Sequence, residues 1–327
     1  MDSSLWPPFH SLPSDNYLAR GANAHVFRIS ANIAFKYPTS ETENTAEICS
    51  RIESEKVVYR VLMDRPHPYI LQAICCVPEG IFLRRMQCTL RERLAQPKTA
   101  IPTQTQELWV WQMASAVAWL ETLGFVHGDL RIANMLLDDD DNLQVADFDA
   151  TVRAGDRLQV GSVPLEKLGN THQQPVAGPV TEQFSLASCM YSVRFGGQDP
   201  WRDVKSARMR NMVRDQLTFP SVAADPLLGE VMTRCWSGEY DSMAAVKQDV
   251  LARLGWTATK TETMHWEAME KRAAVPLDML RQECEEFLAQ EKRGMVPGGS
   301  ACPGGASVKH QGSREQGMGD SQGRERC

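Results

Sequence analysis

The sequence predicts an α+β fold with two lobes, in which a small strand-rich lobe with one helix precedes a larger, mainly helical lobe. Two observations support this prediction. Strand-like apolar runs recur between residues 26 and 83, and one stretch among them, residues 43–64, repeats its apolar residues at helical intervals. Beyond residue 86 the long apolar stretches are helical, apart from one pair of short strand-like runs around a turn.

The elements of the first lobe follow from local patterns. Residues 26–29 and 33–36 are apolar runs joined by a short polar segment, which is typical of a hairpin. Residues 43–64 form the helix, because their apolar residues share one face. Two further strands are expected at residues 70–77 and 80–83.

The second lobe is predicted to consist of helices around one strand pair. A turn of Asp and Asn residues separates the two strands, since these side chains bond their own backbone. The most apolar helix, residues 181–193, should be buried. The strands are expected at residues 135–137 and 143–146, and the helices at 90–94, 104–123, 181–193, 227–236 and 242–254.

The C-terminal part has a different character. Helices are expected at residues 262–273 and 277–290, on either side of Pro276. The second helix places its apolar residues on one face, which favours packing against the domain; binding of a partner protein through residues 277–290 is the alternative. Residues 294–327 are rich in Gly, Ser, Gln and Arg, and this composition predicts disorder.

Composition excludes several classes of protein. The 327 residues carry a formal net charge of −6, which argues against a nucleic-acid-binding protein. No stretch reaches the roughly 18 consecutive apolar residues of a membrane span, and the N-terminus lacks the pattern of a signal peptide. The nine Cys residues form no C-x-x-C pair, and most lie among apolar neighbours, which indicates a reducing, cytoplasmic location.

Three polar residues mark a candidate site. Asp129 and Asn134 lie in a loop after a long apolar helix, and Asp147 follows the strand pair. The hairpin should bring Asp147 back beside Asn134. A carboxylate and an amide oxygen are suited to Mg²⁺, which prefers oxygen ligands. Asp129 would then be available to act on a hydroxyl nucleophile.

The run His127-Gly128-Asp129-Leu130-Arg131-Ile132-Ala133-Asn134 resembles the H-R-D-L-x-x-x-N loop of the eukaryotic protein kinase superfamily, in a divergent fungal-type form with an H-G-D-L-R sequence. Asp147-Phe148-Asp149 resembles the D-F-G motif that follows it. The resemblance covers residues 15–255 and implies the two-lobed kinase fold. The implied division is an extension (1–14), an N-lobe (15–83), a hinge (84–86), a C-lobe (87–255), a helical extension (256–293) and a disordered tail (294–327).

The resemblance also implies roles for these residues. Lys36 ends Ile33-Ala34-Phe35-Lys36, which is similar to the kinase V-A-I-K strand, and would bind the ATP phosphates. Glu55 lies at the kinase spacing, on the inward face of its helix, and needs a partner because an unpaired buried charge is costly. Asp129 and Arg131 would act on the acceptor hydroxyl and the transferring phosphate. Asn134 and Asp147 would hold Mg²⁺.

The nucleotide-covering loop resembles the family pattern least. Aligned on Val26, the G-x-G-x-x-G-x-V motif keeps only Gly21, since alanines replace the other two glycines. Val26 and Ala34 would cover the adenine from the N-lobe, and Leu136 would contact it from the C-lobe. The backbone of Arg84 to Met86 would bond the adenine edge. The consecutive Arg84 and Arg85 are expected to be solvated; pairing with acidic groups of a substrate is the alternative.

Other departures concern the catalytic segment. Gly128 replaces the Arg that binds activation-loop phosphate in related kinases, which predicts activity independent of such phosphorylation. His127 and Phe148 are expected to be packing residues. Pro164-Leu165-Glu166 is similar to the A-P-E motif, and Glu182 occupies the position of a kinase Asp at the start of the large buried helix.

Three functions agree with these features. The first is an ATP-dependent protein kinase, acting on Ser or Thr of a protein substrate. The second is a small-molecule phosphotransferase of the aminoglycoside and choline kinase-like type, whose loops usually read H-x-D-L-H-x-x-N; Arg131 in place of that His favours a protein kinase. The third is a pseudokinase scaffold, which the altered glycine loop and the D-F-D triplet favour and the intact Lys36, Asp129 and Asp147 oppose.

Overall fold

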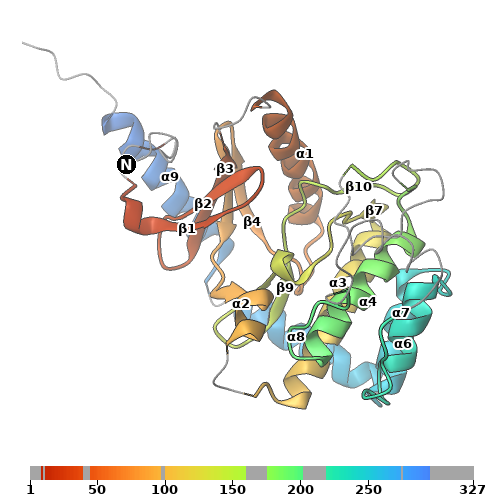
Figure 1. Ribbon diagram of the computed structural model, residues 1–327. Coiled ribbons are helices and arrows are strands. Elements are labelled where there is room, and N and C mark those ends of the chain that lie inside the picture. The colour runs from red at the N-terminus through yellow and green to blue at the C-terminus, as the bar shows by residue number, and fades with distance from the viewer. Residues whose placement is uncertain are drawn as a thin grey trace, which may run out of the picture.

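The chain folds into the two predicted lobes, with a helical extension that continues from the second lobe back to the first (Figure 1). The computed structural model describes residues 9, 12–39, 45–96, 100–159, 175–201, 219–273 and 275–294. The motif at residues 164–166 and the tail from residue 295 onward lie outside the described residues, as does most of the N-terminal extension.

The N-lobe is built on a five-stranded antiparallel sheet with the strand order β1-β2-β3-β5-β4. The predicted hairpin is confirmed, with Val26 opposite Lys36 and Arg28 opposite Ala34. A short 3₁₀ helix, Ser14–Asn16, precedes the sheet. The strands are β1 (Tyr17–Arg20), β2 (Ala24–Arg28), β3 (Ile33–Pro38), β4 (Ala73–Val77) and β5 (Gly80–Arg84).

Helix α1 (Thr45–Asp64) is the helix of the N-lobe. Ile52 and Tyr59 are fully buried on its inward face, as their spacing predicts, and Glu55 lies between them with no exposed surface. Strand β4 begins three residues later than predicted. Ile70 instead forms an isolated parallel bridge with Val145, so this part of the chain joins the C-lobe.

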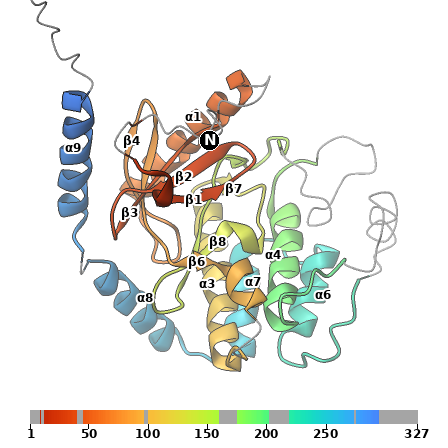
Figure 2. The same cartoon turned by 60° about the vertical axis from the view of Figure 1, so that its left-hand side comes forward.

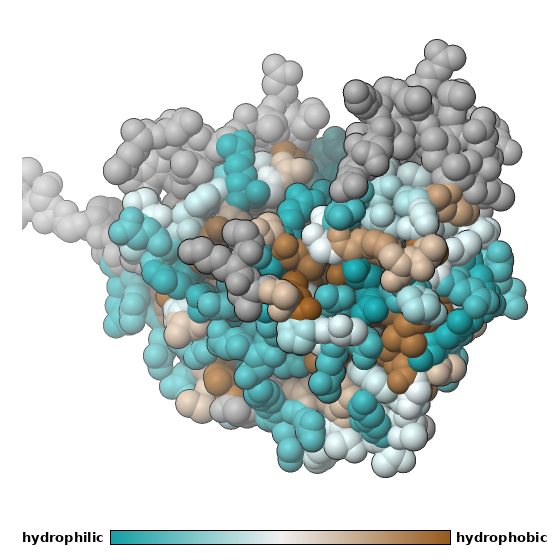
Figure 3. Space-filling view, turned by 60° about the horizontal axis from the view of Figure 1, so that its bottom comes forward, coloured by the Kyte–Doolittle hydropathy of each residue, from teal (hydrophilic) through white to brown (hydrophobic). Residues whose placement is uncertain are grey.

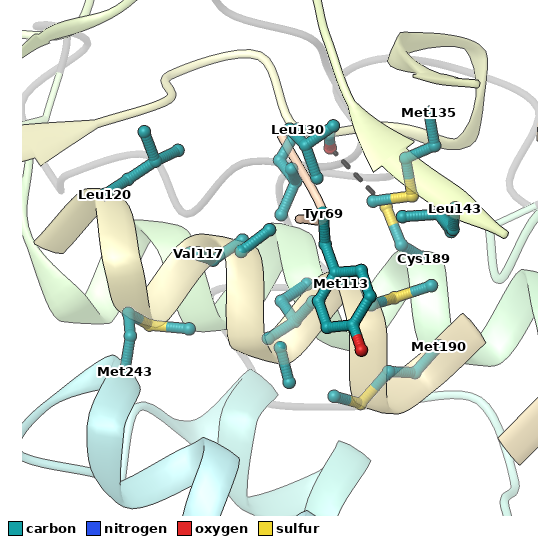
Figure 4. Close-up of a cluster of buried hydrophobic side chains, with 14 of the residues drawn as sticks. Tyr69, Met113, Val117, Leu120, Leu130, Met135, Leu143, Cys189, Met190 and Met243 are labelled. Carbon is teal, nitrogen blue, oxygen red and sulfur yellow. Dashed lines mark hydrogen bonds between the residues drawn. The ribbon is translucent and has the colours of Figure 1, made fainter. Parts of the chain in front are cut away.

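The C-lobe is organised around helix α3 (Thr103–Thr122), most of which is buried. Figure 4 shows Met113 and Val117 of this helix in a cluster with residues of the neighbouring elements. The other helices are α2 (Leu90–Ala95), α4 (Pro179–Arg194), α6 (Gly229–Ser237) and α7 (Met243–Arg253), and a 3₁₀ helix spans Ile132–Asn134.

Short strands flank the loops of the C-lobe. They are β6 (Cys88–Thr89), β7 (Phe125–Val126), β8 (Met135–Leu137), β9 (Leu143–Val145) and β10 (Val152–Arg153). Strands β8 and β9 form the predicted pair. The Asp138 carboxylate accepts hydrogen bonds from the backbone N–H of Asp140 and Asn142, which closes the turn between them.

Helices α8 (Ala258–Ala273) and α9 (Leu277–Gly294) carry the chain from the C-lobe to the N-lobe sheet, as Figure 2 shows. Leu280 and Cys284 of α9 are buried in a cluster with Phe35 and Phe82 of the sheet. The apolar face on which the partner hypothesis rests is therefore occupied within the chain. A partner would have to use another face, such as that of Met279, which is 62% exposed.

The surface in Figure 3 carries small groups of hydrophobic residues among hydrophilic ones. Among the described helices, none is long and apolar enough to cross a membrane. The prediction that most cysteines lie among apolar neighbours is wrong for Cys49, which is exposed on α1, whereas Cys189 and Cys235 are buried.

Candidate functional site

Lys36 joins the two lobes at the candidate site. Its Nζ lies 2.7 Å from Glu55 Oε2 on α1 and 2.5 Å from Asp147 Oδ1, which follows β9. Lys36 and Glu55 are buried, whereas about a third of the Asp147 side chain is exposed. The structure thus brings together three residues that lie up to 111 positions apart in the sequence.

The charges of this group depend on one another. Burial alone would lower the pKa of Lys36, but the carboxylates of Asp147 and Glu55 raise it above its ordinary value. Burial raises the pKa of Glu55 to about 7, although Lys36 opposes this effect. Burial also favours the protonated form of Asp147, yet Lys36 outweighs it and lowers the pKa of that carboxyl group. These shifts favour the cationic form of Lys36 and the ionised form of Asp147.

Asp129, Arg131 and Asn134 form a second group within one loop. Asn134 Nδ2 donates to Asp129 Oδ2 at 2.9 Å and to the Asp129 carbonyl oxygen at 2.9 Å. Arg131 Nε lies 3.1 Å from Asp129 Oδ2. The Asp129 side chain is nearly buried, and that of Arg131 is about one-third exposed, so the guanidinium can reach solvent and a ligand.

Asn134 and Asp147 are neighbours through the backbone, as the hairpin predicts. The N–H of Ala146 donates to the Asn134 carbonyl oxygen at 2.9 Å. Asp147 then adopts φ +68°, a left-handed conformation that is unusual for a non-glycine residue and is typical of functional sites. Asn134 offers an amide oxygen, which accepts a hydrogen bond from Arg131 Nε at 3.3 Å, and Asp147 offers a partly exposed carboxylate. Oxygen donors of these kinds are the ligands that Mg²⁺ prefers.

Glu182 of α4 binds the backbone of this loop, a role that the sequence pattern left unassigned. Its two carboxylate oxygens accept hydrogen bonds from the backbone N–H of His127, at 3.0 Å, and of Gly128, at 3.2 Å. Burial raises the pKa of Glu182, and the charge and N–H groups of the loop oppose that effect. A carboxylate in an otherwise buried helix needs such partners. This requirement is the feature of the sequence that could have identified the role of Glu182.

The structure explains why residue 128 is a glycine, and this reason is independent of the arginine that the kinase motif has there. Its φ is +79°, and a Cβ atom there would lie 2.5 Å from the carbonyl oxygen of Ala150. A side chain of any kind would therefore clash with backbone. In this chain, the position before Asp129 cannot hold the phosphate-binding Arg of related kinases.

His127 and Phe148 are packing residues, as expected. His127 is fully buried, and its Nε2 lies 3.0 Å from the carbonyl oxygen of Ala146. The Phe148 ring lies against His127 and Tyr59. The N–H of Phe148 donates to Glu55 Oε1 at 3.2 Å, which connects the Asp147 turn to α1.

The loop also rests on the core. Figure 4 shows Leu130 beside Cys189 of α4, whose thiol donates to the Leu130 carbonyl oxygen at 3.7 Å. Leu130 itself is 1% exposed. The residues on either side of Asp129 are therefore fixed by burial and hydrogen bonds.

The predicted nucleotide-contacting residues lie on both lobes. Gly21 is in the turn between β1 and β2, where its N–H donates to the Ala24 carbonyl oxygen at 2.8 Å. Val26 and Ala34 lie in β2 and β3, and Ala34 is opposite Leu83 of β5. Leu136, in β8 of the C-lobe, is half-buried.

The hinge residues have contacts that the sequence did not predict. The expectation of two solvated arginines is wrong for Arg84, which is half-buried and donates to Gln72 Oε1 at 2.7 Å and to the Val275 carbonyl oxygen at 2.7 Å. Arg84 therefore attaches the segment between α8 and α9 to the hinge. Met86 is partly buried and packs against the main core.

Comparison with known proteins agrees with this geometry. The family model described as protein tyrosine and serine/threonine kinase matches residues 18–248. The chain is 27% identical over 166 residues to the tyrosine-protein kinase receptor TYRO3 of Gallus gallus, a match that covers 46% of this chain and 18% of that protein. It is 28% identical over 158 residues to the serine/threonine-protein kinase kin-29 of Caenorhabditis elegans, with 45% and 18% covered.

Each of these matches spans less than a fifth of the relative's own length. The family match, in contrast, extends over both lobes and includes every residue of the candidate site. The chain therefore belongs to the protein tyrosine and serine/threonine kinase family.

Proposed function

We propose that the chain is an ATP-dependent protein kinase that transfers the γ-phosphoryl group to a Ser or Thr hydroxyl of a protein substrate. The observation that supports this most directly is the contact of Lys36 with Glu55 and Asp147, which aligns the two lobes around one cation. The catalytic domain would comprise residues 15–255.

Lys36 would contribute charge to nucleotide binding. Its ammonium is buried between two carboxylates, so its position is fixed before any ligand arrives. Phosphoryl transfer depends mainly on such positioning and on charge stabilisation. Asn134 and Asp147 would hold Mg²⁺, which supplies charge compensation for the phosphates when it is bound.

Asp129 would orient the acceptor hydroxyl. Its carboxylate is held by Asn134 Nδ2 and Arg131 Nε, so one oxygen is fixed in direction. Arg131 is partly exposed beside it and would stabilise charge on the transferred phosphoryl group.

The test combines ligand binding with phosphate transfer. Thermal unfolding of the purified chain should show a higher melting temperature with ATP and Mg²⁺, because a ligand that binds the folded state stabilises it. Asp147→Asn should lose this shift. The matched control Asp241→Asn removes an exposed carboxylate of the C-lobe and should keep it.

Transfer is measured with radiolabelled ATP on mixed peptides that carry Ser, Thr or Tyr, with an aminoglycoside and choline as small-molecule acceptors. Asp129→Asn should lower the rate on Ser and Thr peptides by a factor of about 10² or more. Transfer only to small molecules would contradict the proposal. Nucleotide binding without transfer to any acceptor would indicate a scaffold.

A further inference from the structure

One hydrogen bond connects the nucleotide-covering turn of the N-lobe to the D-F-D turn of the C-lobe. Asn23 Nδ2 donates to Asp149 Oδ2 at 2.8 Å, although the two residues are 126 positions apart. Asn23 lies between β1 and β2, two residues after Gly21. Asp149 is the third residue of Asp147-Phe148-Asp149, where the family motif has glycine.

Both ends of this bond are held by their surroundings. The carbonyl oxygen of Asn23 accepts a hydrogen bond from the N–H of Thr39 at 3.0 Å. Asp149 is 9% exposed, and the turn that contains it closes with a bond from the N–H of Thr151 to the Phe148 carbonyl oxygen. The bond therefore connects two turns whose backbones each make hydrogen bonds of their own.

The charge of Asp149 adds to an acidic environment. Lys36 is already in contact with the carboxylates of Glu55 and Asp147. Asp149 adds a further buried carboxylate two residues after Asp147. Nucleotide phosphates are anions, so this carboxylate repels them unless a divalent cation accompanies them.

We propose that Asp149 is a positioning and selectivity residue: its bond with Asn23 holds the residue 21–23 turn against the D-F-D turn, and its charge excludes nucleotide phosphates that carry no divalent cation. The selectivity rests on the proposed nucleotide site, whereas the position of the turn does not. A glycine at this position would provide neither effect.

Two variants separate the bond from the charge. Asp149→Asn removes the charge but keeps a carbonyl oxygen that can accept from Asn23. Asn23→Ala removes the bond and keeps the charge. Asp241→Asn is the matched control, since it removes an exposed carboxylate of the C-lobe that is far from Asp149 in the sequence. Melting temperatures of all the proteins establish that each variant is folded.

Binding of ADP is measured at constant ionic strength, with Mg²⁺ and with EDTA. Asp149→Asn should gain at least tenfold in affinity for metal-free ADP and change less than threefold for ADP with Mg²⁺. The control should match the unmodified chain in both conditions. An unchanged ratio of the two affinities in Asp149→Asn would overturn the selectivity.

Hydrogen exchange of the amides of residues 21–24 tests the position of the turn without any nucleotide. Asn23→Ala should speed this exchange at least fivefold, and Asp149→Asn should leave it within twofold. Unchanged exchange in Asn23→Ala would overturn the positioning role. If the chain and all variants bind no ADP, the nucleotide site and the selectivity both fail, and the exchange result still decides the positioning role.

Discussion

Gly21 in the N-lobe and Gly128 in the C-lobe both lie in turns that border the candidate site, yet their surroundings differ. A Cβ atom at Gly21 would meet its nearest neighbour, the Ala24 carbonyl oxygen, at 3.5 Å, an ordinary contact. At Gly128 the same atom would lie 2.5 Å from the Ala150 carbonyl oxygen, in a left-handed backbone conformation. The surroundings of Gly21 therefore admit a Cβ atom, whereas those of Gly128 exclude one.

This difference extends to the two halves of the site. The loop around Asp129 is fixed by Glu182, by the buried ring of His127 and by the core beneath Leu130. The residue 21–23 turn is exposed at Gly21 and is joined to the C-lobe by the bond from Asn23 to Asp149. We infer that the geometry at Asp129 is determined by packing within the C-lobe, whereas the position of the residue 21–23 turn depends on the bond from Asn23 to Asp149.

The largest effect should come from Glu182→Ala. The substitution leaves the backbone N–H groups of His127 and Gly128 buried without their acceptor, and each such loss costs roughly 1–3 kcal/mol. With the space left behind, the free energy of unfolding should fall by about 3–5 kcal/mol. Chemical denaturation measures this change.

The matched control is Glu230→Ala, which removes a carboxylate that is 62% exposed on α6. It should change the free energy of unfolding by less than about 0.5 kcal/mol. A loss below about 1 kcal/mol in Glu182→Ala would show that the C-lobe half of the site is held by other contacts.

Gly128→Ala should destabilise the chain by about 2–4 kcal/mol, because backbone strain and a clash with Ala150 act together. Gly196→Ala isolates the strain, since Gly196 has φ +66° and no atom within 4 Å of its added Cβ. That control should cost about 1 kcal/mol. Equal losses in thermal or chemical unfolding would mean that the Ala150 carbonyl group moves aside easily.

The sequence predicted the helices and strands around the candidate site better than the contacts between them. The hairpin of β2 and β3 and the inward face of α1 follow from local periodicity, and they place Lys36 near Glu55. The bonds of Glu182 to His127 and of Asp149 to Asn23 join residues 55 and 126 positions apart. Periodicity identifies the face that a residue occupies, but not the distant surface that the face meets.

Arg84 illustrates the same limit. Two adjacent arginines in a polar segment indicate solvent exposure, and only the path of the chain brings the Val275 carbonyl oxygen beside one of them. The acidic turn after β8 was predictable in contrast, because its bonds lie within five residues. Interactions local in sequence were therefore predictable, as was the packing of the apolar face of α9, but the contact of Arg84 with Val275 was not.

Leu280→Ala tests whether the packing of α9 stabilises the N-lobe sheet. Leu280 on α9 is 1% exposed and packs with Phe35 and Phe82 of the sheet. Removal of its side chain should lower the free energy of unfolding by about 2–3 kcal/mol. Met279→Ala, at a position that is 62% exposed on the same helix, should have little effect. Equal behaviour of the two variants in chemical denaturation would mean that α9 adds nothing to the stability of the sheet.

Gly21→Ala should have the smallest effect on stability, below about 1 kcal/mol, because its backbone conformation and surroundings admit a methyl group. The comparison becomes sharper if this variant is measured beside Gly128→Ala by chemical denaturation. Under the proposed function its affinity for ADP with Mg²⁺ should fall by no more than about threefold, a change worth roughly 0.7 kcal/mol. A tenfold loss would show that Gly21 is kept for close approach of the phosphates, and the cover over the nucleotide would then be as constrained as the loop around Asp129.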